Sequence, residues 1–181
     1  MSKQVSVTYG FNISNMQSEA ITTLTARYDL REDRIALDCL LHDQNQLIIF
    51  LTQRFANAVV LELTKLVSKS ENSELIHEFT QVNAVSNKTS SDPVKISGDQ
   101  NLCWLATHMH IQLVDDVHRL IFTEDNREGV HLHCDEHMLR NVLDILHKAF
   151  SKAQWDQSAF PAWIRVNENE DGIVHKATEW H

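Results

Sequence analysis

The chain has 181 residues, a formal net charge of −9, four glycines and two prolines. Average usage would give about twelve glycines and nine prolines. No glycine-rich phosphate loop is present, which excludes the usual nucleotide-binding folds. The acidic balance disfavours polyanions and anionic membranes as partners. The first residues lack the apolar core of a signal peptide, and the three widely spaced cysteines predict reduced thiols. Together these features predict a cytoplasmic protein with no membrane partner.

The first half of the chain predicts strands followed by a helix. An extended piece over 5–13 comes first. Alternating apolar residues and short polar connections then predict three strands. These strands cover 21–30, 34–42 and 47–52. Apolar residues at helical spacing from Phe55 predict a helix to about Lys69, and Thr52 is suited to be its N-cap.

The second half repeats this plan. A short extended piece over 94–96 precedes three predicted strands, which cover 104–113, 117–123 and 130–134. Asp135 stands where Thr52 stood, and the residues after it again recur at helical spacing. Each half therefore predicts a β-β-β-β-α unit.

The two halves also align with each other. A shift of 83 positions matches 11–69 with 94–152 without a gap, with 11 identities and a shared hydrophobic pattern. We therefore predict an α+β fold built by internal duplication. Each unit would be an antiparallel meander with one amphipathic helix, and the two units would be related by a pseudo-twofold axis.

The predicted organisation follows from these boundaries. The first β4α unit occupies 1–82, and the polar stretch 83–101 leads into the second unit over 94–152. A short helix is also possible over 74–80, before that stretch. The remaining 153–181 is an aromatic tail that holds three of the four tryptophans, and we expect it to pack back onto the core. Its last part, 173–180, could add an edge strand.

Histidine is unusually frequent, with eleven in the chain. His131 and His133 share one face of a predicted strand, and His137 follows in the first helical turn. Imidazole is an ordinary zinc ligand, so these three histidines form a candidate zinc site. A second pair, His108 and His110, lies two strands away, about 9–10 Å from the first. One ion cannot take both pairs, and exposed or interface histidines are the alternative interpretation.

No catalytic motif accompanies these histidines. The chain has no nucleophile elbow, no HExxH motif and no paired-carboxylate signature. Cys134 corresponds to Leu51 in the first unit, which favours a core position over a reactive thiol. We therefore predict a protein that is not an enzyme, and the sequence identifies no small-molecule substrate and no cofactor unless zinc binds.

The outer face of the predicted sheets is the candidate contact surface. Residues 47–51 are apolar on both faces, as in a strand that is covered twice. The candidate interface residues are Arg27, Ile48 and Phe50 in the first unit and His110, Arg119 and Ile121 in the second. We expect a non-catalytic binding or assembly module that contacts a protein partner or a second copy of itself.

Tandem β4α units resemble, in their fold plan, the PUR-type and whirly-type single-stranded nucleic-acid binders. The resemblance implies single-stranded nucleic acid as an alternative partner. Neither of the two aligned segments is basic, with 6 basic and 7 acidic residues over 11–69 and 6 and 9 over 94–152. Nucleic-acid binding needs a basic face, so this function ranks second.

Overall fold

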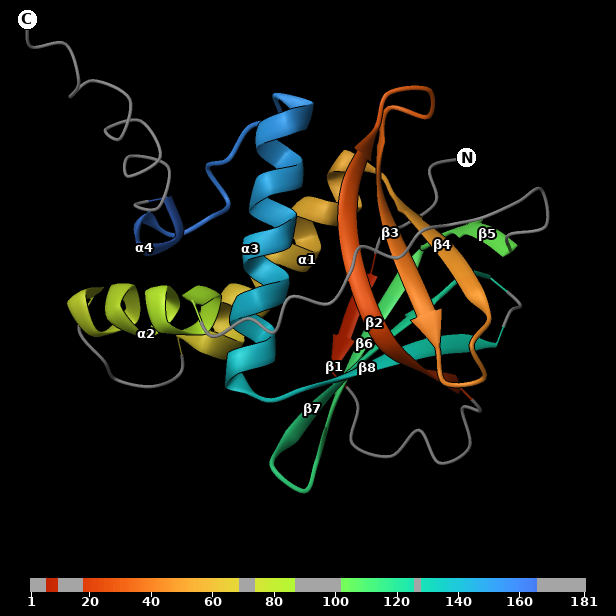
Figure 1. Ribbon diagram of the computed structural model, residues 1–181, viewed down its shortest axis with the longest axis horizontal. Helices are drawn as coiled ribbons and strands as arrows, with labels where there is room; N and C mark the ends of the chain where they lie inside the picture. The colour runs from red at the N-terminus through yellow and green to blue at the C-terminus, as the bar shows by residue number, and fades with distance from the viewer. Residues whose placement is uncertain (1–5, 10–17, 69–73, 87–101, 126–127, 166–181) are drawn as a thin grey trace, which may run out of the picture.

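The computed structural model describes residues 6–9, 18–68, 74–86, 102–125 and 128–165 (Figure 1). Within these ranges the chain forms strands on one side and helices on the other. The strands are β1 (Ser6–Tyr9), β2 (Ser18–Asp29), β3 (Arg34–Leu41), β4 (Gln46–Leu51), β5 (Leu102–Leu105), β6 (His108–Val114), β7 (Val117–Thr123) and β8 (Gly129–Cys134). The helices are α1 (Gln53–Val67), α2 (Glu74–Ser86), α3 (Glu136–Ala153) and α4 (Ala162–Arg165).

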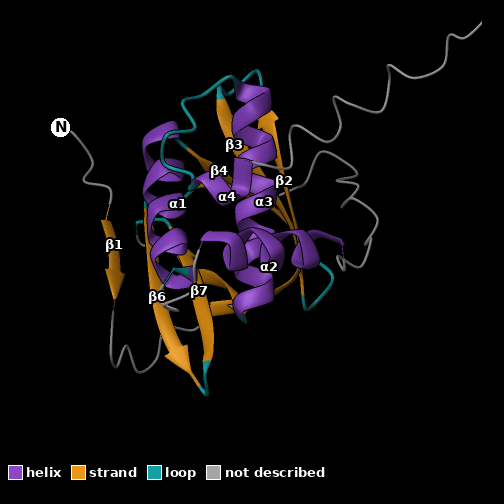
Figure 2. Ribbon diagram, turned by 90° about the vertical axis from the view of Figure 1, so that its left-hand side faces the viewer, coloured by secondary structure: helices purple, strands orange, loops and turns teal. Residues whose placement is uncertain are grey.

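All the described strands belong to one mixed sheet, so the fold is α+β. The strand order is β1-β6-β7-β8-β2-β3-β4-β5. Two antiparallel meanders, β2–β3–β4 and β6–β7–β8, are joined by parallel pairing of β2 with β8. Figure 2 shows β1 at the outer edge of the sheet beside β6, with which it pairs in parallel.

The sequence predicted that the extended piece over 5–13 would join the first meander, but its described part, β1, does not. β1 pairs with β6 of the second meander, and β5 pairs in parallel with β4 of the first. The strand predicted over 104–113 is divided into β5 and β6, because the chain changes partners at its middle. The Ala106 amide donates to the Phe50 carbonyl at 3.0 Å, and the Thr107 amide donates to the Thr123 carbonyl at 3.0 Å.

The segment from β5 to β6 therefore connects the strand beside β4, at one end of the strand order, with the strand beside β7, which is second from the other end. β2 bends in a similar way. Its first residues, 18–20, pair with β8, and the rest pairs with β3 after a register shift between Ile21 and Thr23. Such irregularities increase the twist of a strand, so the sheet is strongly curled.

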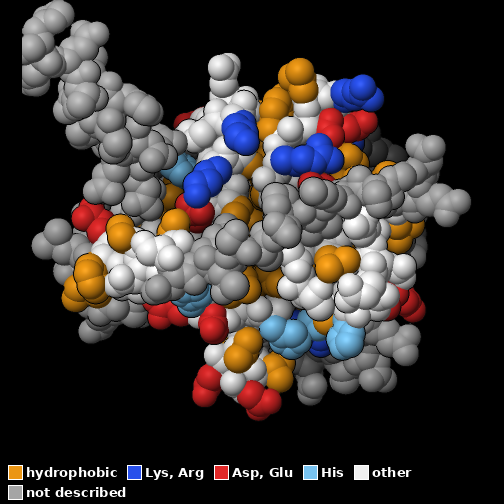
Figure 3. Space-filling view, viewed as in Figure 1, with side chains coloured by type: hydrophobic (Ala, Val, Ile, Leu, Met, Phe, Trp, Pro, Cys, Tyr) orange, Lys and Arg blue, Asp and Glu red, His pale blue; other side chains and the backbone are white. Residues whose placement is uncertain are grey.

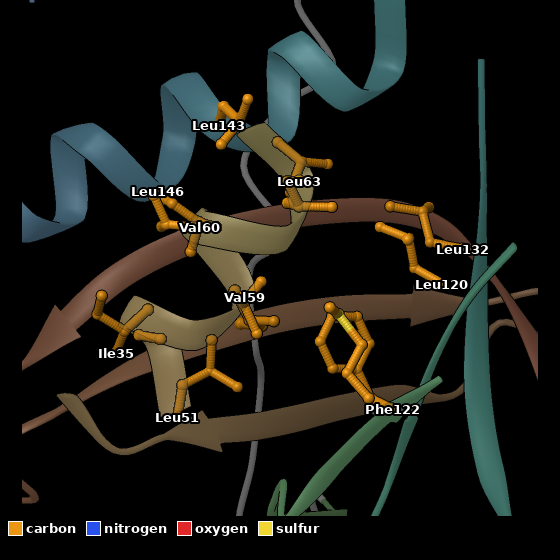
Figure 4. Packing of buried hydrophobic residues seen from close by; sticks show 14 of the residues in the cluster. Ile35, Leu51, Val59, Val60, Leu63, Leu120, Phe122, Leu132, Leu143 and Leu146 are labelled. Atoms are coloured by element: carbon orange, nitrogen blue, oxygen red, sulfur yellow. The ribbon is translucent and has the colours of Figure 1, made fainter. Parts of the chain in front are cut away.

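The two long helices lie on one face of the curled sheet, and each begins where the sequence placed its N-cap. The Phe55 amide donates to the Thr52 hydroxyl at 3.2 Å, and the Met138 amide donates to the Asp135 carboxylate at 2.7 Å. Both caps are confirmed. Figure 4 shows Leu143 of α3 beside the apolar side chains of α1, which in turn cover the strands.

The hydrophobic core lies between these helices and the sheet. It takes alternate residues from the strands, as the period of two in the sequence predicted. The core strand residues are Ile21, Ile35, Leu37, Cys39, Leu41, Leu47, Ile49, Leu51, Trp104, Met109, Ile111, Leu120, Phe122, Val130, Leu132 and Cys134. The opposite face of each meander, which we call the outer face, is open only in part. Ala36, Asp38, Ile121 and His131 lie on it and are also buried, so Ile121, a predicted contact residue, is not accessible.

Two local features fix the second meander. Asp115 and Asp116 connect β6 to β7 with positive φ angles of 49° and 62°, as a two-residue type I′ hairpin requires. Gly129 opens β8 at a close approach of the backbone. A Cβ there would lie 2.9 Å from the Phe122 carbonyl oxygen and 2.7 Å from Thr123 Cγ2. Glycine is therefore the residue that fits this position.

A second helical layer lies beyond α3. α2 is longer than the short helix suggested by the sequence and runs to Ser86, into the stretch predicted as a linker. It contacts α3 and α4. From the tail, Phe160, Trp163 and Ile164 are buried. The possible edge strand over 173–180 and the extended piece over 94–96 lie outside the described residues. No helix in the described part of the chain is long and apolar enough to span a bilayer.

Candidate functional site

The outer face of the second meander carries the residues on which the candidate functions depend. Strand register places Ile121 between His110 and His131, and Arg119 between Gln112 and His133. Alternation along the strands had predicted this shared face. Figure 3 shows histidine side chains gathered on the molecular surface next to β8.

Four of these side chains form a hydrogen-bonded group, which we call the Arg119 cluster: Ser18, Arg119, His131 and His133. Arg119 Nη2 donates to Ser18 Oγ at 2.7 Å and lies 3.1 Å from His131 Nδ1. Ser18 Oγ lies 2.9 Å from the same Nδ1, and His131 Nε2 lies 3.1 Å from His133 Nε2. The cluster joins β2, β7 and β8 at the seam between the two meanders.

Arg119 gives the cluster a permanent positive charge. Burial, followed by the nearby Arg119 guanidinium and His133, lowers the pKa of His131 to about 4. Burial and His108 likewise lower the pKa of His110. His131 is therefore a neutral imidazole at physiological pH, and with Nδ1 facing two donors its proton lies on Nε2.

The lowered pKa of His131 predicts a loss of stability in acid. An unfolded chain, in which the pKa is near the ordinary value of 6.5, takes up the proton before the native state does. This contribution to stability is thus complete above pH 6.5 and is lost as the pH falls towards 4. In urea unfolding between pH 7 and 4, His131→Asn should show a shallower decline than the wild type. Equal slopes in the two proteins would contradict the structure.

The candidate zinc residues do not all come together. His131 and His133 are in contact, with their ring centroids 4.8 Å apart, whereas His137 is exposed in the first turn of α3. Among the residues that the structure describes, no three His, Cys, Asp or Glu side chains form a group suited to a metal ion. Because cations repel each other, Arg119 also disfavours a metal at His131. Zinc binding stays a prediction.

The outer face of the first meander is organised by an ion network. Arg27 donates to Asp38 at 2.9 Å and to Asp29 at 2.6 Å. Ile48 and Phe50, the other proposed contact residues, are half-buried in this face. Register places Ile48 opposite Asp38 and Phe50 opposite Ala36. Arg27 is therefore already paired within the fold, and these apolar side chains expose only part of their surface.

Among the described helices, α2 carries the most exposed apolar side chains. The sequence had not singled out this helix. Ile76, Phe79 and Val82 are 49%, 71% and 43% exposed; we call them the α2 stripe. Figure 3 shows hydrophobic side chains on the surface over α2. The opposite face, with His77, Gln81 and Ala84, is buried. The spacing of three residues was a usable signal, but only the buried side of α2 shows which face is left outside.

Ser18 was also missed. It lies at the start of β2, far in sequence from β8, and the parallel pairing of these strands brings it to His131.

Comparison of the chain with family models, curated proteins and solved structures returned no match. The candidate function therefore rests on the geometry of these surfaces.

Proposed function

We propose that the chain is a non-catalytic assembly module and that it associates with a second copy of itself through the α2 stripe. The observation that carries this proposal is the exposure of Phe79, at 71%, between two further exposed apolar residues on the same helix face. Exposed contiguous apolar side chains on a soluble protein mark contact sites. An aromatic residue at the centre of such a site supplies much of the binding energy.

A second copy suits this stripe because of charge. The chain carries −9, so two copies repel each other unless they meet at a neutral surface. Ile76, Phe79 and Val82 are uncharged, and the exposed Asn83 and Ser86 beside them are neutral as well. Around a twofold axis such a helix packs against itself, so that each stripe covers its own equivalent. The stripe is small, which predicts weak, concentration-dependent association.

Phe79→Asp should abolish self-association, because it places two like charges at the centre of the contact. The measurement is sedimentation equilibrium over a range of protein concentrations, with circular dichroism as the check on folding. We expect the wild type to move towards twice the chain mass and the variant to stay at the chain mass.

The matched control is Leu61→Asp, which changes an exposed apolar residue of α1 that is 48% exposed. It should associate like the wild type. A wild type that remains monomeric at every concentration, or an equal loss in both variants, would rule out the α2 stripe as the contact.

The non-catalytic part of the proposal is supported by the Arg119 cluster itself. Ser18, His131 and His133 are connected like a nucleophile, a base and an orienting group. A general base works best when its pKa is near the working pH. The pKa of His131 is about 4, so it is a poor proton acceptor for Ser18 at neutral pH.

We also infer that the two sheet halves are copies of one unit. Part of the strand pairing supports this, since some pairs in the two halves differ by 83 in both members. Glu19 pairs with Val130 as Leu102 pairs with Leu47. The pairing of β3 with β4 and that of β7 with β8 follow the same rule. The pairing of β2 with β3 and that of β6 with β7 do not, because Arg27 pairs with Ala36 whereas His110 pairs with Ile121.

The three free cysteines support the expected cytoplasmic location.

Single-stranded nucleic acid has less support as a partner. A strand of phosphates is bound by several cations along a groove, usually with stacked aromatic rings. The described outer face of β6–β8 offers a single arginine, Arg119, and the adjoining β6–β7 turn carries Asp115 and Asp116. Binding of a single-stranded oligonucleotide that depends on Arg119 would favour this alternative.

A further inference from the structure

We propose that the Arg119 cluster is a binding site for one carboxylate group. The site is distinct from the α2 stripe, and the proposal does not depend on self-association. Its elements are the guanidinium of Arg119, the hydroxyl of Ser18 and the imidazole of His133, all on the outer face near the seam between β2 and β8.

The first argument is the charge on Arg119. Arg27, Arg34 and Arg140 each pair with carboxylates of their own chain. Arg119 is half-buried, yet the side chains that contact its guanidinium are a serine and a histidine. No carboxylate among the described residues pairs with it. A partly buried cation without an anion is costly, and a bound anion removes that cost.

The second argument is the state of the guanidinium nitrogens. Nη2 is held by Ser18 and His131, which fixes the plane of the group. Nε is buried and has no hydrogen-bond partner, and Nη1 has none among the residues that the structure describes. Donors held in a fixed plane and left unsatisfied are a ready site for a planar oxyanion, because arginine matches carboxylate geometry.

The third argument selects a carboxylate over a phosphate. Arg119 supplies a permanent single positive charge, because a guanidinium stays protonated throughout the physiological pH range. A carboxylate balances that charge, whereas a phosphate dianion would add excess negative charge to a chain that already carries −9. His133, which is exposed and lies in register with Arg119, is placed to donate a further hydrogen bond.

The experiment titrates sodium acetate against the protein at neutral pH and constant ionic strength. Binding is followed by the NMR signals of the Arg119 side chain and the His131 and His133 rings. We expect a saturable shift in the wild type and at least tenfold weaker binding in Arg119→Gln. Ser18→Ala should also weaken binding, since it releases one partner that fixes the guanidinium. Arg34→Gln, which changes a partly exposed arginine that pairs with Glu32, should bind as the wild type does.

Further probes separate the sources of the carboxylate. A capped tripeptide with a central glutamate that binds more tightly than acetate identifies an acidic side chain of a protein. A tripeptide that binds no better identifies a free small acid. The same capped tripeptide with glutamine in place of the central glutamate should not bind in either case.

Three outcomes would overturn the proposal. The first is an unsaturable shift in the wild type, or equal binding by folded Arg119→Gln. The second is tighter binding of inorganic phosphate than of acetate. The third is binding of a single-stranded oligonucleotide, dependent on Arg119, at concentrations where acetate has no effect.

Discussion

Replacing Phe122 by alanine is expected to lower the free energy of unfolding by about 3–5 kcal/mol. Phe122 is 2% exposed and extends from β7 towards α1, where Figure 4 shows it beneath Val59. Truncation removes the transfer energy of the ring and leaves a cavity between the second meander and the first helix. Surrounding strands from both meanders limit how far the structure can collapse into that space.

The measurement is equilibrium urea unfolding at a low protein concentration, followed by circular dichroism. Phe79→Ala is the matched control, because it removes the same atoms from a side chain that is 71% exposed. We expect it to change the free energy of unfolding by less than about 0.5 kcal/mol. Equal losses in the two variants would show that β7 is not packed beneath α1 as described.

The second large effect is expected at Arg140, the buried cation of α3. It is 1% exposed, donates to Glu136 at 2.8 Å, and lies 3.1 Å from Nδ1 of His77 in α2. Its guanidinium also stands over the ring of Trp163 in α4, 5.1 Å from the centroid. One side chain thus connects three helices.

Arg140→Met should cost about 1–3 kcal/mol, because the His77 carbonyl and ring lose a buried partner. We expect the loss to be local. Hydrogen exchange should become faster in α2 and α4, while the amides of β3 and β7 stay protected.

The control for this variant is Arg34→Met. The ion pair of Arg34 with Glu32 is partly exposed, so its loss should cost less than about 1 kcal/mol. Unchanged exchange in α2 of Arg140→Met would mean that Arg140 does not hold the second helical layer in place.

Much of the local structure was predictable because it depends on short-range physics. The meander strands are close to their predicted bounds, since alternation is a strong signal when one face is buried. Thr52 and Asp135 cap their helices because a short side-chain acceptor before an apolar stripe satisfies free amides. The shared face of the histidines and Arg119 followed from the same alternation.

Long-range pairing was not predictable from these patterns. A leading strand such as β1 has the same local signal whether it joins β2 or β6, and the structure pairs it with β6. The division of the predicted strand 104–113 into β5 and β6 could not be predicted for the same reason. The backbone changes its pairing partner between Ala106 and Thr107 because of which strands lie nearby. The spacing of hydrophobic residues does not tell which strands these are.

The candidate sites likewise depend partly on local patterns and partly on long-range contacts. The scarcity of glycine and proline and the charge of −9 excluded phosphate loops and disfavoured polyanions directly from the sequence. Local pattern likewise determined the strands, the two capped helices and the side chains that share the outer face.

Only the tertiary structure decided that Ser18 reaches His131, that Arg119 is held by neutral groups, and that α2 exposes Phe79. The reason is physical. Periodicity fixes which side of an element is apolar, whereas parallel pairing and helix packing decide what lies against that side.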